Sequence, residues 1–330
     1  MQFRPLKRRE FITLIGGAAA AWPVAARAQQ LKTVFQVGFL YPGFQAAMAS
    51  RVAAIQSGLR AGGLRAEQFE ILPRTTDGNP AMLTPMAADL VSRKVDLICA
   101  QSSTAVRAAR TMTDSISIVA ADLESDPIEE GFIATHARPG RNITGVFLDF
   151  PDFSKKWLEV LKETIPQLAS VAVLWDPAVS PYQLKSVGIG AQTLGLTLVV
   201  QEVRRSDEFE PAFVSIVQKG AGAVVMLTST IIGGATKLLA DLALRHRLPA
   251  ITLFSDFARN GGLMAYGPNL LGVVRHQGIM AAKVLLGANP AVTPIEAPTR
   301  FEFVLNLKTA NALGLTIPAV VLLRADEVIE

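Results

Sequence analysis

The side chains of this 330-residue chain that could contact a ligand are hydroxyls, carboxylates and aromatic rings that directly follow short apolar runs. If those runs are parallel strands, their carboxyl ends meet at one edge of a sheet, where open α/β sheets bind their ligands. Hydroxyls at such an edge can bind an anion, a carboxylate can meet an amine, and aromatic rings can form an apolar wall. In the first half of the chain these residues are Tyr41, Phe44, Gln101, Ser102, Ser103, Thr104 and Asp122. In the second half they are Trp175, Asp176, Tyr182, Thr228, Ser229, Thr230, Phe254 and Asp256.

The segment from Gln101 to Thr104 is the most informative of these positions, because its three hydroxyls stand between an apolar run and the expected start of a helix. Hydroxyls beside the free N–H groups of a helix N-terminus can bind an anion such as a carboxylate. Any single one of them could instead be an N-cap that needs no ligand. We expect the loop of Ser102, Ser103 and Thr104 to hold the carboxylate of a ligand.

Asp256 follows the apolar run PAITLFS and admits two interpretations. It is either a solvated residue that caps the next turn or a countercharge for a ligand amine. We expect it to face the amine of a ligand whose carboxylate lies on the hydroxyl loop. Tyr41, Trp175 and Tyr182 could form the walls of the site, although an aromatic ring at a strand end can equally pack against its own domain.

Patterns for catalysis and for cofactors are missing from the sequence. The three histidines have no metal-ligand spacing, and one cysteine, Cys99 within VDLICA, excludes a disulfide scaffold and a Cys-rich zinc site. The sequence has no H-E-x-x-H, nucleophile elbow or P-loop, and no G-x-G-x-x-G follows the first apolar run. It therefore predicts no catalytic residue, no metal and no cofactor, and Cys99 is expected to be a small buried apolar residue.

The elements that position these residues follow from the rest of the sequence. Short apolar runs alternate with segments in which apolar residues have helical spacing, and this pattern is typical of parallel strands joined by crossover helices. The second half repeats the order of the first, which predicts an α/β fold of two similar three-layer α/β/α lobes with a ligand cleft between them. A helix through Val273 to Leu286 exceeds the repeat and is expected to cross back onto one lobe. The expected strands of the first half are 34–40, 69–75, 95–101, 115–121 and 142–148. Those of the second half are 171–177, 196–203, 223–229, 249–255 and 261–267.

The first 28 residues have the features of an export signal. A basic start precedes an apolar stretch, and Ala26-Arg27-Ala28 offers small residues to a signal peptidase, so cleavage after Ala28 and a periplasmic location are predicted. Arg8-Arg9 fits a twin-arginine signal, with the general secretory route as the alternative. This segment carries five of the 32 basic residues and one of the 28 acidic ones, which leaves a neutral body without the basic stripe expected of a nucleic-acid-binding protein. Because glycines and a proline interrupt the apolar stretch of the first 28 residues, stable membrane insertion is not predicted.

From about Lys32 onward, the chain resembles the substrate-binding proteins of ABC transporters, a group that includes tryptophan- and tyrosine-binding members. The resemblance rests on VGFLYPG, DGNP (77–80), LVSRKVDLICA, SDPIEEGFI, ARPGRNITG and the ending from PTRFEFVLNLK to the C-terminus. It implies a type I periplasmic-binding-protein fold that closes over a small ligand. By position, Ser102 to Thr104 match the first-lobe loop that holds a ligand carboxylate. Two departures concern the ligand: this loop lacks the usual glycine-threonine pair, and Asp176 stands where Asn is common.

The resemblance implies an extracytoplasmic solute-binding protein that captures an amino acid or related carboxylate. Its expected partners are a small-molecule ligand and the transmembrane subunits of an ABC permease, and the protein is expected to be a monomer. A sensory ligand-binding module and an exported enzyme are the alternatives. The expected first lobe comprises residues 31–147 with about 268–300, and the second comprises 148–267 with about 301–330.

Overall fold

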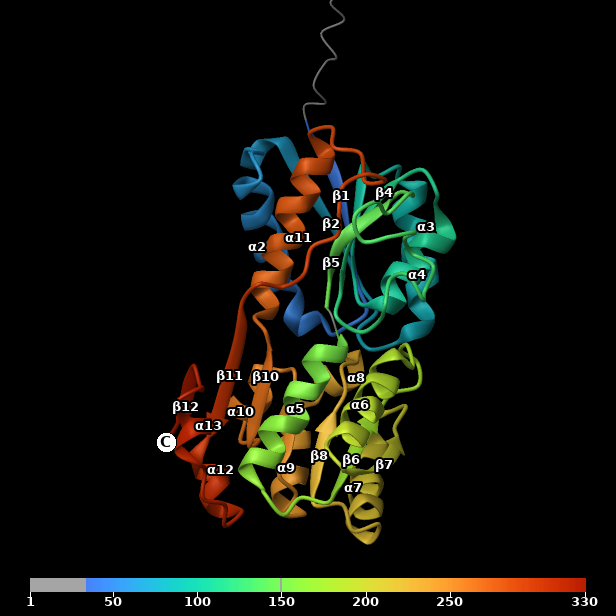
Figure 1. The fold of residues 1–330 in the computed structure, drawn as a ribbon. Helices are drawn as coiled ribbons and strands as arrows, with labels where there is room; N and C mark the ends of the chain where they lie inside the picture. Colours follow the sequence, from blue (N-terminus) through green and yellow to red (C-terminus); the bar gives the residue numbers. More distant parts are fainter. Residues whose placement is uncertain (1–33, 149) are drawn as a thin grey trace, which may run out of the picture.

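Two separate sheets organise the computed structural model, which describes residues 34–148 and 150–330. Each sheet forms the centre of one lobe, and Figure 1 shows the first lobe above the second. The predicted export signal of residues 1–28 lies outside the described residues. Within the described part of the chain, no helix has the length and apolarity needed to cross a membrane.

The first lobe contains a parallel sheet in the order β2-β1-β3-β4-β5. Its strands are β1 (Phe35–Tyr41), β2 (Phe69–Thr75), β3 (Leu97–Gln101), β4 (Ser117–Asp122) and β5 (Ile143–Phe147). Its helices are α2 (Met48–Ala61), α3 (Leu83–Ser92), α4 (Ser103–Met112) and α11 (Leu270–Leu285), with short 3-10 turns η1 (Gln45–Ala47), η2 (Ala66–Gln68) and η3 (Pro80–Met82).

Strand β3 shows why this sheet needs helices on both faces. All five of its residues are buried, and successive side chains of a strand point to opposite faces. Leu97 and Cys99 join the apolar cluster of α2 and α11, whereas Ile98 and Ala100 join that of α3 and α4. Figure 1 shows the two helix pairs on opposite sides of the sheet. Burial in this apolar core raises the pKa of the Cys99 thiol to about 12.

The second lobe contains a larger sheet in the order β12-β11-β10-β9-β8-β6-β7, in which only β10 and β11 pair in antiparallel fashion. Its strands are β6 (Ser170–Trp175), β7 (Thr197–Glu202), β8 (Ala223–Met226), β9 (Ala250–Thr252), β10 (Met264–Pro268), β11 (Phe301–Asn306) and β12 (Glu327–Ile329). Its helices are α5 (Phe150–Thr164), α6 (Tyr182–Thr193), α7 (Phe209–Gln218), α8 (Thr230–Gly234), α9 (Thr236–Arg245), α10 (Ser255–Arg259), α12 (Leu307–Ala312) and α13 (Ala319–Leu322), with the turn η4 (Ser206–Glu208).

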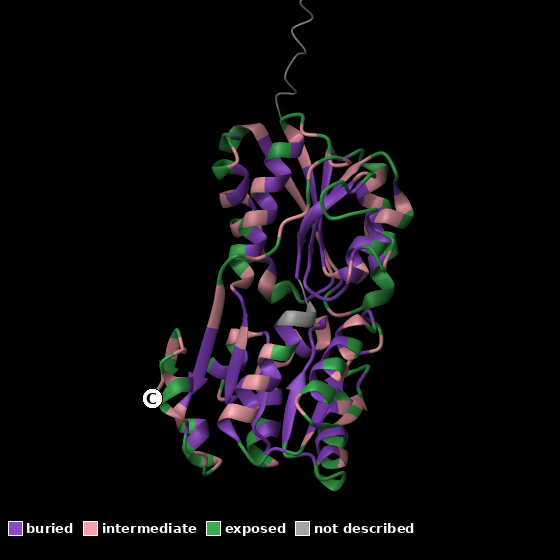
Figure 2. Ribbon diagram, viewed as in Figure 1, coloured by how far each residue is buried: buried purple, intermediate pink, exposed green. Residues whose placement is uncertain are grey.

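The chain passes between the lobes at three points. It leaves the first lobe after β5, returns after β10 to form α11 beside α2, and runs back along residues 286–300 into β11 (Figure 1). The antiparallel pairing of β10 with β11 follows from this route, because β11 re-enters the second sheet from the side that faces the first lobe. In both lobes the strands are mostly buried, and the helices that cover them expose their outer surfaces (Figure 2).

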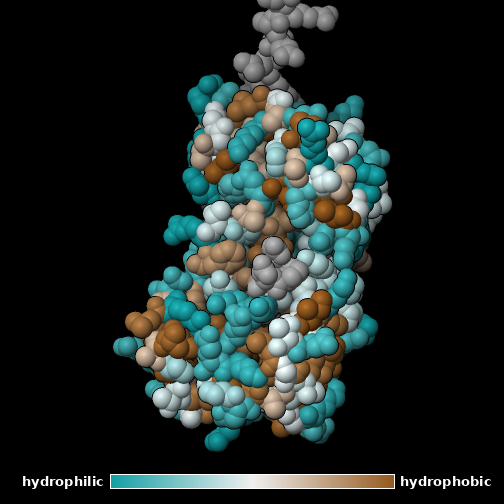
Figure 3. Space-filling view, viewed as in Figure 1, coloured by the Kyte–Doolittle hydropathy of each residue, from teal (hydrophilic) through white to brown (hydrophobic). Residues whose placement is uncertain are grey.

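The structure confirms the predicted α/β class with two lobes, and it departs from a strict duplication. The second sheet has two more strands, β11 and β12, than the first. Helix α5 was not among the predicted elements, although Phe153, Trp157, Leu158 and Leu161 recur at helical spacing and are buried. The surface shown in Figure 3 is a mixture of hydrophilic and apolar residues. Among the exposed apolar side chains of the protein, Leu323 is 87% exposed.

Candidate ligand-binding cleft

A cleft of about 520 Å³ lies where the carboxyl ends of strands from the two sheets approach each other. Both lobes contribute to its walls, as the rule for open α/β sheets predicts. Of the residues singled out from the sequence, those lining it are Tyr41, Phe44, Gln101, Ser102, Thr228, Ser229, Thr230, Phe254 and Asp256. Side chains that the sequence did not suggest also line it, namely Arg51, Leu123, Glu124, Leu270, Val273 and Val274.

Arg51 is the only cationic side chain among the described residues that line the cleft. Its guanidinium carbon lies 4.3 Å from the centre of the Tyr41 ring, and its Nη1 donates a 2.7 Å hydrogen bond to Gln101 Oε1. Gln101 in turn donates from Nε2 to Gln277 Oε1 at 3.2 Å. Gln277 is fully buried and donates to two main-chain carbonyls of the first sheet, so this network fixes the Arg51 side chain against the lobe.

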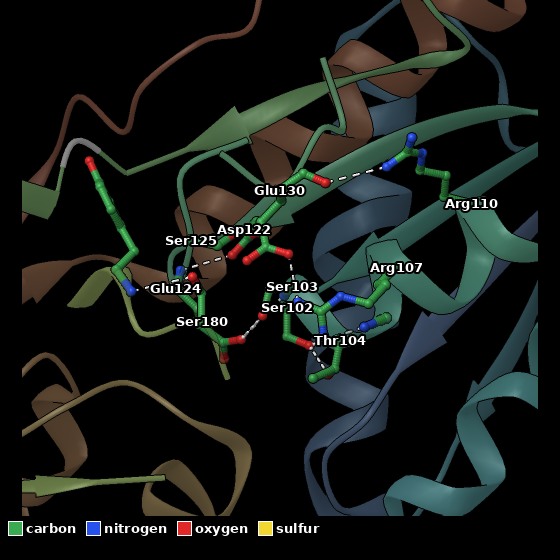
Figure 4. Close-up of polar contacts among 12 residues, drawn as sticks. Ser102, Ser103, Thr104, Arg107, Arg110, Asp122, Glu124, Ser125, Glu130 and Ser180 are labelled. Carbon is green, nitrogen blue, oxygen red and sulfur yellow. Dashed lines mark hydrogen bonds and ion pairs between the residues drawn. The ribbon is translucent and has the colours of Figure 1, made fainter. Parts of the chain in front are cut away.

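The predicted hydroxyl loop begins helix α4: the hydroxyls of Ser102 and Thr104 contact each other, whereas that of Ser103 points to Glu124 (Figure 4). Ser102 is the N-cap: its Oγ accepts from the Ala105 N–H at 3.4 Å and lies 2.8 Å from Thr104 Oγ1. Its φ of 77° is unusual for a residue other than glycine and turns the chain sharply from strand to helix. Ser103 is fully buried and donates from both its N–H and its Oγ to Glu124 Oε2.

Two buried carboxyl groups stand behind this loop. Asp122 is fully buried and accepts from the Ser125 hydroxyl at 2.5 Å and from the Glu124 N–H at 2.8 Å. Glu124 is 5% exposed and lines the cleft. Burial raises the pKa of Glu124 to about 8, with the nearby charges of Asp122 and Asp176 acting in the same direction. Burial likewise raises the pKa of Asp122 to about 6.

In the second lobe, Thr228 is held by the buried side chain of Gln183. The Gln183 amide donates to the Thr228 carbonyl and accepts from the Thr228 N–H, both at 2.8 Å. Thr228 is 5% exposed, and its Oγ1 has no hydrogen-bond partner among the described residues. Ser229 follows as the N-cap of α8, with its Oγ accepting from the Ile232 N–H. The wall of the cleft therefore includes a residue, Thr228, whose buried hydroxyl is unpaired among the described residues.

Four more residues of the second lobe were predicted to contact the ligand, and their side chains lie in different environments. Asp256 stands at the cleft with a side chain that is 74% exposed and 3.4 Å from Arg259. Asp176 accepts from the Ala178 N–H, and burial raises its pKa. Tyr182 begins α6, and its N–H donates to Ser180. Trp175 ends β6 with a buried Nε1 that has no partner in the described part of the chain. Of these four, only Asp256 is among the residues that line the cleft.

Sequence reasoning missed Arg51 and Glu124 for different reasons. Arg51 lies in the first turns of α2 rather than at a strand end. Glu124 lies two residues beyond the end of β4, between the strand-end candidate Asp122 and the segment SDPIEEGFI, and so belongs to neither of the patterns singled out. A search for charged residues within a few positions of every strand end would have found Glu124. Across the described ranges, no group of three or more His, Cys, Asp or Glu side chains is arranged to hold a metal ion.

The two-lobed α/β architecture with a cleft between the lobes is the type I periplasmic-binding-protein fold. A conserved domain protein from Vibrio cholerae has this architecture, with a TM-score of 0.82 and 22% identity, covering 89% of this chain and 99% of that one. A Streptococcus pneumoniae ABC domain in complex with L-Trp has the same TM-score, with 23% identity and the same two coverages.

Residues 44–329 match the family described as ABC transporter substrate binding protein. Since the match covers most of the chain, this protein belongs to that family. A tyrosine-binding protein of Clostridioides difficile is 25% identical over 232 residues, which is 70% of this chain and 66% of that protein. The matched region thus spans slightly less than two thirds of this curated relative.

Proposed function

We propose that the protein is the extracytoplasmic binding component of an ABC importer and that it captures an amino acid or a related small carboxylate. The observation that carries this proposal is the cleft between the lobes, which presents a cation, carboxyl groups and hydroxyls beside an apolar wall of Leu270, Val273 and Val274. An amphipathic ligand with a zwitterionic head and an apolar side chain matches this combination. The tyrosine-binding relative supports the same ligand class.

Capture follows from lobe closure. A ligand that contacts both walls binds the closed arrangement more tightly than the open one, and the difference in affinity shifts the population toward closure. An ion pair already joins the two lobes: Lys185 of α6 lies 3.3 Å from Glu129 of the first lobe. A cleft volume of about 520 Å³ is in the range of sites for small organic ligands.

The proposed partners are the small-molecule ligand and the transmembrane subunits of an ABC permease, which the closed lobes would contact together. We place the mature protein, beginning at Gln29, in the periplasm as a monomer that performs no catalytic turnover. Its neutral body gives no reason to expect a nucleic-acid partner.

A thermal-shift screen of the mature chain against the standard L-amino acids and simple carboxylates tests this function. The protein is first unfolded and refolded under dialysis, so that any ligand acquired during expression is removed. A ligand that binds only the folded state raises the midpoint of thermal unfolding with increasing concentration. We expect at least one amino acid with an apolar or aromatic side chain to do so. Binding by none of the panel, or by sugars instead, would overturn the proposed ligand class.

A further inference from the structure

The cleft contains one cationic group and one buried carboxyl group on the same lobe, with an unpaired hydroxyl on the other. From this arrangement we infer that Arg51 holds the carboxylate of the bound amino acid, that Glu124 holds its ammonium group, and that Thr228 completes the site. The inference rests on the proposed function, since it concerns how an amino acid is oriented in that cleft. It differs from the sequence-based expectation, in which the hydroxyl loop and Asp256 had these roles.

Arg51 suits a carboxylate because its guanidinium has N–H donors to spare. One Nη1 hydrogen bond goes to Gln101, and the described residues supply no further partner for the remaining N–H groups. The contact with the Tyr41 ring and the Gln101–Gln277 network hold the planar group in one orientation. A guanidinium fixed in this way binds a carboxylate through two parallel hydrogen bonds.

Glu124 suits the ammonium group better than Asp256 because of where each carboxyl lies. Within residues 34–148 and 150–330, Oε2 is the Glu124 oxygen that accepts hydrogen bonds, both from Ser103, and the residue lines the cleft while being 95% buried. A charge pair formed there is shielded from water. The Asp256 side chain is 74% exposed and already lies beside Arg259, so an ammonium group at Asp256 would remain in high dielectric.

Thr228 adds a neutral contact from the opposite lobe. Its backbone is held on both sides by Gln183, and its buried Oγ1 has no partner in the described part of the chain. A buried hydroxyl without a partner is unfavourable, so a ligand that hydrogen-bonds to Oγ1 recovers that energy only when both lobes enclose it. Thr228 therefore links recognition of the polar head to closure.

A proton should leave Glu124 when the amino acid binds. Burial favours the neutral acid, and the groups that face Glu124 from neighbouring elements are Asp122 at the end of β4, Asp176 at the end of β6 and the Ser103 hydroxyl on α4. The carboxylates raise the pKa of Glu124, and Ser103 opposes them only in part. An ammonium ion beside Oε1 stabilises the carboxylate instead. The proton then passes to the buffer, and the ligand retains its own charge.

The test compares an amino acid with its decarboxylated and deaminated analogues by isothermal titration calorimetry. The first series is L-tyrosine, tyramine and 3-(4-hydroxyphenyl)propionate; if the screen favours leucine, it is L-leucine, 3-methylbutylamine and 4-methylpentanoate. Glu124→Gln should weaken binding of the amino acid about tenfold or more while leaving the deaminated acid within about threefold of wild type. Arg51→Met should give the same loss for the amino acid and spare the amine. Glu70→Gln, on an exposed position of β2, is the matched control.

A second measurement needs no variant. Titrations of wild-type protein in phosphate and in Tris near neutral pH should give different apparent enthalpies, because the released proton is taken up by the buffer. A loss of affinity in Asp256→Asn with unchanged affinity in Glu124→Gln would overturn the inference and leave the proposed function intact. Equal enthalpies in both buffers would also overturn the proton release. If no amino acid binds the wild-type protein, the proposed function fails and the inference fails with it.

Discussion

At the scale of single residues, Glu124 and Asp122 show how the fold changes the chemistry of ordinary carboxyl groups. Both are removed from water beside the cleft, and burial raises the pKa of each, to about 8 for Glu124 and about 6 for Asp122. The hydrogen bonds from Ser103 and Ser125 lower these values only in part. Glu124, which lines the cleft, and Asp122, which lies behind it, therefore stay neutral at pH values where exposed glutamate and aspartate are charged.

The raised pKa of Glu124 should make the stability of the folded protein depend on pH. Because the pKa of Glu124 is about 8 in the folded protein against 4.5 for an ordinary glutamate, the folded state binds more protons between these values. The free energy of unfolding should then fall as pH rises from about 5 to 8, since deprotonation is easier in the unfolded chain. Thermal unfolding of ligand-free protein, followed by circular dichroism across this range, measures the effect.

The comparison variant is Glu124→Gln, which cannot titrate at this position. We expect a shallower fall in the unfolding midpoint for this variant than for wild type, with Asp122 accounting for part of the remainder at the acidic end of the range. A midpoint that rises between pH 5 and 8, or an identical slope in both proteins, would contradict the burial of these acids.

Replacing Thr228 should change the stability of the protein and its affinity for an amino acid in opposite directions. Thr228→Val replaces the unpaired Oγ1 with a methyl group of similar size, so the free energy of unfolding should rise by up to about 1 kcal/mol while amino-acid affinity falls several-fold. Thr252→Val is the control, because Thr252 Oγ1 donates a 3.0 Å hydrogen bond to the Met226 carbonyl and should lose about 1 kcal/mol of stability. Urea unfolding and calorimetry measure the two effects. Reduced stability in Thr228→Val would show that its hydroxyl has a structural partner.

At the scale of elements, the contact between α2 and α11 joins the beginning of the chain to a helix more than two hundred residues later. The helices approach each other closely at Gly58 and Gly278. A Cβ atom on Gly58 would lie 2.0 Å from the Arg275 carbonyl oxygen and 2.8 Å from the Gly278 Cα. Such a contact is with backbone and cannot be relieved by rotating a side chain. The absence of a side chain at Gly58 is therefore what allows α11 to cover the first sheet.

Gly58→Ala should lower the free energy of unfolding by about 2 kcal/mol or more, because overpacking forces the two helices apart. Gly188→Ala in α6 is the matched control: its nearest neighbour would be Leu198 Cδ2 at 3.9 Å, an ordinary contact. This control should be neutral or slightly stabilising, since alanine favours a helix over glycine. Chemical denaturation of both variants distinguishes the packing effect from helix propensity. Equal stabilities would argue against close helix packing at Gly58.

At the scale of the whole molecule, the two lobes touch beside the cleft as well as through the three chain crossings. Phe44 of the first lobe lies against Gly234 of α8 in the second: a Cβ atom added at Gly234 would be 2.1 Å from Phe44 Cε2. Gly233, beside it, leaves room for the Phe254 ring in the same way. Of these two contacts, only the one between Phe44 and Gly234 joins the lobes, and it depends on the absence of a side chain at Gly234.

Gly234→Ala should weaken amino-acid binding by roughly threefold to tenfold, because the added methyl group displaces the Phe44 ring and raises the free energy of closure. The unfolding midpoint without ligand should stay near that of wild type, since Gly234 is exposed and its lobe does not need the contact. Small-angle X-ray scattering should show the radius of gyration falling on addition of amino acid in wild type and falling less in the variant. Full compaction of the variant at unchanged affinity would exclude this contact from closure.

The local pattern of the sequence was enough to predict most elements and the fold class. Strand β2 (Phe69–Thr75) has the predicted bounds, because hydrophobic periodicity and stop signals act over neighbouring residues. The rule for strand ends also located the cleft. The export signal, cleavage after Ala28 and the ligand-binding roles of individual residues stay predictions.

Only the tertiary structure decided which side chains face the cleft. Gln101 and Ser103 are two residues apart, yet Gln101 lines the cleft and Ser103 turns inward to Glu124. Arg51 is held in place through Gln277, a residue of a different helix that is distant in sequence. The physical reason is that periodicity is a local property, whereas the direction of a side chain at a strand end depends on contacts with elements brought together only when both lobes are folded.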